Sequence, residues 1–202
     1  MNLQKRDCGM EMKLVPYGAG WTDVHFKIGD DNLYFIITSV WGDQFSRLLE
    51  VLYCLHPDQH DPQYVHVVDF WDETPQKIEL NWDEEGSSSH WSFLRLPSET
   101  EDFQVQIDIC IRRDEEKHYS YQVRYQDFCY AVAKTCTEVL KSHGIYGYHH
   151  STYVDDLNLR HLLFVKAVAL DCFDARTLTW FEEGLGEGTD FEKELELLLF
   201  DM

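Results

Sequence analysis

The strongest constraint on the fold lies in residues 103–125, where apolar and polar side chains alternate. A period of two is typical of a β-strand with one buried face, because successive side chains of a strand point to opposite faces. A turn at residues 113–116 divides the run, which predicts two antiparallel strands. Their shared apolar face would carry Phe103, Val105, Ile107, Ile109, Ile111, Tyr119, Tyr121, Val123 and Tyr125. Because such a face must be covered, the chain needs a second layer.

The rest of the chain predicts strands first and helices afterwards. Strands are expected at residues 12–15, 21–28, 33–40, 64–71, 76–82 and 90–96, with a last edge strand at 176–181. Helices are expected at residues 44–55, 126–142 and 157–170. This order indicates an α+β fold, an antiparallel β-sheet meander with helices packed on one face, in one domain over residues 1–202. Residues 181–202 are expected to form an acidic helix or a tail.

Turn and cap residues set the expected boundaries of these elements. Residues 83–89 and 146–153 are predicted as loops, and Gly144 is expected to stop the second helix. Either Asp155 or Asp156 is expected to cap the third helix. The form Thr189-Asp190-Phe191-Glu192 is a capping box, which predicts the start of the C-terminal helix.

The charge of the chain excludes one class of partner and favours another. With 17 Lys+Arg against 37 Asp+Glu, the formal net charge is −20. Residues 72–102 hold nine acids and two bases, and residues 181–202 hold eight acids and one base. A surface of this kind repels nucleic acid and attracts basic proteins. We therefore expect a basic protein partner and no nucleic acid.

The sequence also predicts where the protein resides and which chemistry it lacks. No apolar run is long enough to cross a membrane, and the start of the chain lacks the apolar core of a secretory signal, so we expect a cytoplasmic protein. The six cysteines form no C-x-x-C pair and are expected to be reduced and structural. We find no phosphate-binding glycine loop and no nucleophile elbow, and we expect no cofactor.

Two acidic segments are the candidate partner-binding surface. Each follows a tryptophan at the end of a predicted strand, as large aromatic anchors beside charges do in protein interfaces. The candidate residues are Trp71, Asp72, Glu73, Asp83, Glu84 and Glu85. Trp82 itself continues the alternation of Ile78 and Leu80, so we expect it to be buried.

Two histidine pairs offer an alternative metal or catalytic site. His56 and His60 lie beside Asp58 and Asp61, and His149 and His150 precede Asp155. Imidazole and carboxylate groups bind transition metals, and a histidine can act in proton transfer near neutral pH. Surface loops that bind no metal remain the other interpretation of both segments.

The order of these elements resembles that of the immunity proteins of bacterial polymorphic-toxin systems. The likeness covers early strands, the helix at 44–55, the meander to Tyr125, the helix from Phe128 to Leu140 and the Tyr/Gly segment after it. The resemblance implies an α+β fold, no catalysis and binding to a cognate toxin. It favours a non-enzymatic acidic protein that masks a basic partner. The alternatives are a metal- or ligand-dependent enzyme that uses His149, His150 and Asp155, and a self-associating structural component.

Overall fold

The computed structural model describes residues 9–18, 20–38, 44–57, 77–84, 87–98, 103–152, 157–172, 179–182, 186–189 and 191–202. Its elements confirm the α+β fold. A three-stranded antiparallel sheet holds β1 (Met10–Gly18), β2 (Trp21–Ile28) and β3 (Asp31–Thr38) in that order. A four-stranded meander holds β4 (Lys77–Glu84), β5 (Ser87–Arg95), β6 (Gln104–Arg112) and β7 (Glu116–Arg124).

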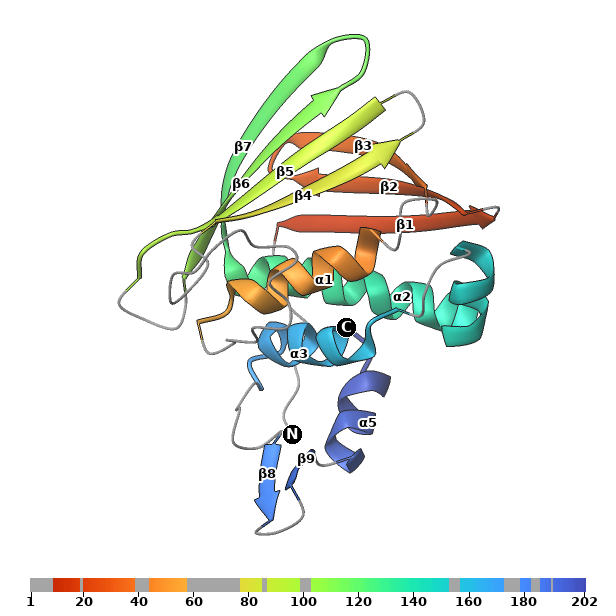
Figure 1. Ribbon diagram of the computed structural model, residues 1–202, viewed down its shortest axis with the longest axis vertical. Coiled ribbons are helices and arrows are strands. Elements are labelled where there is room, and N and C mark those ends of the chain that lie inside the picture. Colours follow the sequence, from red (N-terminus) through yellow and green to blue (C-terminus); the bar gives the residue numbers. More distant parts are fainter. Residues whose placement is uncertain are drawn as a thin grey trace.

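The helices lie together on one side of the two sheets (Figure 1). They are α1 (Gln44–Leu55), α2 (Tyr125–Thr152), α3 (Leu159–Ala169) and α5 (Phe191–Leu199). A short hairpin of β8 (Thr179–Glu182) and β9 (Gly186–Thr189) lies beside α5, at the end of the molecule farthest from the sheets (Figure 1). None of the described helices is long and apolar enough to span a bilayer.

The inner face of the meander is covered by the other sheet as well as by helices. Phe35 of β3 packs against Trp82 and Trp91, with ring centroids 5.5 and 5.2 Å apart. The two tryptophans are themselves 4.6 Å apart, and both are fully buried. Phe128 of α2 reaches the same cluster, 6.0 Å from Phe93. The layer that the meander requires is therefore shared between β1–β3 and α2, and Trp82 lies in the core as predicted.

Several predicted boundaries match the structure closely. Strand 21–28 is β2, helix 44–55 is α1, and the alternating run 103–125 becomes β6 and β7 in antiparallel register. The C-terminal helix is present as α5. The predicted strand 64–71 lies outside the described residues. The cysteines within these residues, Cys54, Cys110, Cys129, Cys136 and Cys172, are reduced thiols.

Other predicted boundaries differ from the structure. Residues 87–89 are not a loop but the start of β5, because Ser88 and Ser89 pair with β6. Gly144 does interrupt the second helix as predicted, with a φ of 70°, but a further helical segment follows it within α2, so residues 146–152 are helical and not a loop. Asn158, rather than an aspartate, caps α3, since its side chain accepts a hydrogen bond from the His161 N–H. Of the strand expected at 176–181, residues 179–181 are described, and they lie in β8, which pairs with β9 in a separate two-stranded sheet.

The aromatic cluster between the sheets predicts a large loss of stability on truncation. Because Trp91 contacts residues of both sheets, we expect Trp91→Ala to lower the free energy of unfolding by about 3–5 kcal/mol. Urea unfolding followed by far-UV circular dichroism measures the loss. Tyr146, 82% exposed on α2, offers a matched aromatic control, and Tyr146→Ala should change the stability by less than about 0.5 kcal/mol. Equal effects of the two variants would contradict this account of the core.

Candidate functional site

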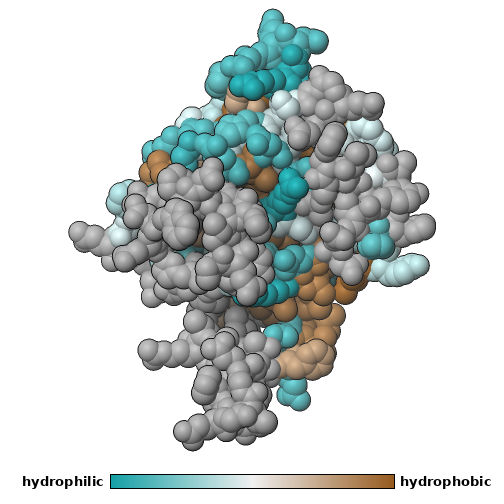
Figure 2. All heavy atoms as spheres, viewed as in Figure 1, coloured by the Kyte–Doolittle hydropathy of each residue, from teal (hydrophilic) through white to brown (hydrophobic). Residues whose placement is uncertain are grey.

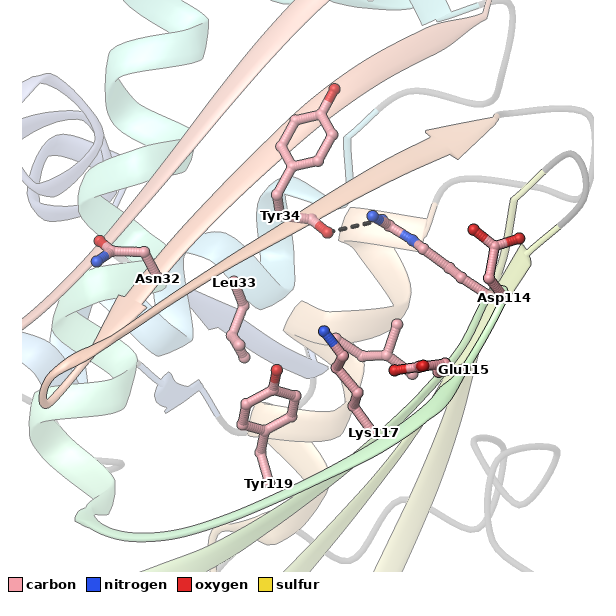
Figure 3. A pocket seen from close by; sticks show the side chains of 9 residues that line it. Asn32, Leu33, Tyr34, Asp114, Glu115, Lys117 and Tyr119 are labelled. Carbon is pink, nitrogen blue, oxygen red and sulfur yellow. Dashed lines mark hydrogen bonds between the residues drawn. The ribbon is translucent and has the colours of Figure 1, made fainter.

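A cleft of about 500 Å³ opens between β3 and the tip of the β6–β7 hairpin. Figure 3 shows Lys117 and Tyr119 of β7 pointing toward β3, with Leu33 opposite Tyr119. Its lining residues are Asn32, Leu33, Tyr34, Ile111, Arg113, Asp114, Glu115, Lys117 and Tyr119. Two cations and two carboxylates give this lining no net charge.

Two hydrogen bonds between the sheets hold the walls of the cleft. Arg113 donates from Nη2 to the backbone carbonyl of Tyr34 at 2.8 Å, and its guanidinium lies 5.8 Å from the centre of that tyrosine ring. Tyr121 donates to the Asp31 carboxylate at 2.8 Å. Partial burial, and then this bond to Asp31, raise the pKa of Tyr121. The cleft is thus an ordered, charge-balanced opening whose walls are fixed at both strands.

The C-terminal helix α5 presents a different kind of surface. Phe191, Leu195 and Leu199 are 70%, 42% and 69% exposed. Their spacing of four places them in one stripe along the helix, because residues four apart lie on the same face. Glu192, Lys193, Glu194 and Glu196 lie between the residues of this stripe along the chain, with three carboxylates against one ammonium. Figure 2 shows apolar residues gathered over the part of the molecule where α5 lies, with hydrophilic residues beside them.

This stripe faces solvent because another face of the same helix is held by the core. Leu197 is buried, and Leu198 and Phe200 pack against the core. A helix that used its apolar residues only for folding would turn them all inward. In α5 the apolar residues divide between two faces, one held by the core and one exposed to solvent.

A buried lysine holds the end of α5 in place. Lys166 of α3 has no exposed surface, and its ammonium donates to the carbonyls of Leu198 and Phe200 at 3.1 and 2.7 Å. It also donates to the Thr137 hydroxyl of α2 at 3.2 Å. A cation at the C-terminal end of a helix satisfies carbonyls that lack intrahelical partners. Lys166 therefore fixes α5 relative to α2 and α3.

The residues predicted to bind a partner lie mostly outside the described part of the chain. Trp71, Asp72, Glu73 and Glu85 all do so. Asp83 and Glu84 end β4, and Asp83 pairs with Ser88 across the meander. This part of the predicted surface stays a prediction.

The predicted histidine sites are placed in part. His56 is buried after α1, with its ring 5.3 Å from that of Phe164 and 5.9 Å from that of Tyr125. His149 is exposed in the last turns of α2, and His150 follows it there. His60 and Asp155 lie outside the described residues. Within those residues, the group of metal-ligating side chains that lie close together is Cys110, Glu116 and His118, which includes none of the four predicted histidines.

Sequence reasoning missed both Lys166 and the exposed stripe of α5. In the sequence, Lys166 is the one charged residue within the apolar run from Leu162 to Leu170. This charge was the only sign in the sequence that Lys166 has a structural role. The stripe was visible as Phe191, Leu195 and Leu199 at helical spacing, but the sequence does not say which face of the helix meets the core. No known protein family matches the chain, and comparisons with curated proteins and with solved structures find no match.

The buried ammonium of Lys166 predicts a pH-dependent stability. Burial lowers the pKa of Lys166 to about 8, against an ordinary value of 10.5. Below pH 8 both folded and unfolded chains hold this proton, and the cost of burying the charge is present in full. Between these two values the unfolded chain keeps a proton that the folded chain has released, so this group makes the free energy of unfolding rise with pH.

The contribution of Lys166 is isolated by comparing the protein with Lys166→Met. Burial raises the pKa of the Cys129 and Cys172 thiols, which makes stability fall with pH, but both proteins share that loss. We expect the stability of the unmodified protein relative to Lys166→Met to increase from about pH 8 to about pH 10. Urea unfolding at each pH measures the difference. A difference that does not vary with pH would contradict the assignment.

Proposed function

We propose that the protein is a non-enzymatic binding protein that masks a basic protein partner through the surface of α5. The observation that carries the proposal is the exposed stripe of Phe191, Leu195 and Leu199 beside glutamates. Apolar side chains supply the contact area of a protein interface, and surrounding carboxylates select a cationic partner.

The net charge of the chain supports the sign of this partner. Residues 181–202 carry eight acids and one base, and α5 lies within them. A chain with a formal charge of −20 attracts a basic surface from a distance and repels an acidic one. By contrast, the cleft between β3 and β7 is charge-balanced, so it supports no choice between cationic and anionic partners.

The anchoring of α5 supports binding without a large ordering cost. Lys166 holds the C-terminal end of the helix, and Leu197 is inserted into the core. A surface that is already ordered before the partner arrives loses less conformational entropy on binding. The stripe is in this sense preorganised.

The kind of partner follows from the resemblance to immunity proteins. We propose that the basic partner is a toxin domain and that its active surface is covered by steric occlusion. Co-expression tests this part: the basic C-terminal domain of a secreted protein encoded beside this chain should arrest growth alone and be neutralised when both are produced. Continued growth arrest in the presence of the protein would contradict the assignment of the partner as a toxin. The binding surface on α5 is tested by a separate experiment.

The binding surface is tested by removing its apolar stripe. We expect Phe191→Ser combined with Leu199→Ser to weaken binding to the purified partner by at least about tenfold, because buried aromatic and aliphatic anchors each contribute more than about 1 kcal/mol. Biolayer interferometry with the partner immobilised measures the dissociation constant. Tyr146→Ser, which removes an exposed aromatic residue from α2, is the control and should bind as the unmodified protein does.

The charge contribution is tested separately through the association rate. We expect the triple change Glu192→Gln, Glu194→Gln and Glu196→Gln to slow association with the partner. The salt dependence of the association rate should also decrease, because the changes remove part of the electrostatic attraction that salt screens. Stopped-flow measurements from low to physiological salt give the rate. If the association rate of the unmodified protein did not depend on salt concentration, electrostatic selection of the partner would be refuted.

A further inference from the structure

The outer face of the β6–β7 hairpin brings a thiol, an imidazole and a carboxylate together. Cys110 of β6 is paired in register with His118 of β7, and Glu116 lies two residues before His118 on the same face. One ligand atom from each of the three side chains lies within 4.8 Å of the others. The strand pairing explains this proximity, because directly opposed side chains of an antiparallel pair lie about 5 Å apart at Cβ.

The contacts of Glu116 show that the site already attracts positive charge. One carboxylate oxygen accepts a hydrogen bond from Arg112 Nε at 2.9 Å, and the other lies 2.8 Å from His118 Nε2. Both neighbours of this carboxylate are nitrogen donors, and Arg112 brings a positive charge against it. Both carboxylate oxygens therefore have hydrogen-bond partners, and a metal ion that binds Glu116 and His118 takes the place of the hydrogen bond between them.

The histidine and the glutamate of this group are reachable from solvent. His118 and Glu116 have side chains 69% and 48% exposed, and Cys110 is half-buried between them and β5. An ion can enter without opening the core, and exposed side chains can make small adjustments. Bonds of about 2.0–2.3 Å place tetrahedral ligand atoms about 3.3–3.8 Å apart, so His118 Nε2 and the Glu116 oxygen must separate from 2.8 Å, while ligand atoms up to 4.8 Å apart must approach by on the order of 1 Å.

We propose that Cys110, Glu116 and His118 bind a divalent zinc-type metal ion. Thiolate sulfur, imidazole nitrogen and carboxylate oxygen are the ligands of zinc, whereas magnesium and calcium take oxygen ligands only. Binding releases the thiol proton of Cys110 to solvent, and the Nε2 proton that His118 donates to Glu116 moves to Nδ1 or to solvent, so that Nε2 can supply its lone pair. The fourth tetrahedral position faces solvent and is filled by water.

The ion joins β6 to β7 just before the tip that carries Arg113, Asp114 and Glu115 into the cleft. Metal binding therefore steadies the hairpin wall of that cleft. The site lies on the meander and α5 lies at the far end of the molecule (Figure 1), so this proposal and the proposed partner surface stand or fall independently.

Cobalt(II) provides the test, because a cobalt–thiolate bond gives a charge-transfer absorption in the near ultraviolet. We expect the full chain, kept reduced with a phosphine, to develop this band at one equivalent of cobalt and to lose it when zinc is added. Cys110→Ser should abolish the band. His118→Ala should weaken cobalt binding by at least about tenfold. Loss of a group that only hydrogen-bonds a metal ligand already costs about that much, and His118 is proposed as a ligand itself.

Matched controls separate this site from the other cysteines and histidines of the chain. Cys172→Ser removes a half-buried thiol that hydrogen-bonds the Ala167 carbonyl, and His25→Ala removes an exposed histidine of β2. Both variants should keep the band, and far-UV circular dichroism checks that every variant is folded. A band that persists in Cys110→Ser, or no thiolate band in the unmodified protein, would overturn the proposal.

Discussion

The packing of Trp82, Trp91 and Phe35 between the two sheets is the contact on which the rest of the structure depends. Ring centroids 4.6 to 5.5 Å apart bring the meander and β1–β3 face to face. Offset and edge-on contacts at these distances add to the gain from burying large apolar surfaces. Since β3 and the β6–β7 hairpin are the two walls of the cleft, this packing also sets where the cleft opens.

The alternating run at 103–125 and the strand at 21–28 could be predicted because their signal is local. Each alternates with a period of two and is bounded by turn residues. Residues 87–89 could not be assigned in this way, because three serines after acids favour a loop by composition. Pairing with β6 overrides that preference, and such pairing is invisible to a local pattern.

The candidate surface of α5 was only half predictable, for the same reason. A capping form and helical spacing predict the helix, but the face that meets the core is chosen by distant residues. Lys166, Leu198 and Thr137 come from three separate segments of the chain. The Cys110–His118 pair likewise depends on register, because a one-residue slip of β7 would send His118 to the opposite face.

The hydrogen bond from Arg113 to the Tyr34 carbonyl has a consequence for assembly. β3 is an outer strand of its sheet, and outer strands present backbone groups on which a further chain can pair. The guanidinium occupies one of these acceptors, and the hairpin that carries it stands against that edge. A strand from a second molecule would have to displace the Arg113 side chain before it could pair with β3. The hydrogen bond therefore disfavours edge-to-edge pairing of sheets between molecules.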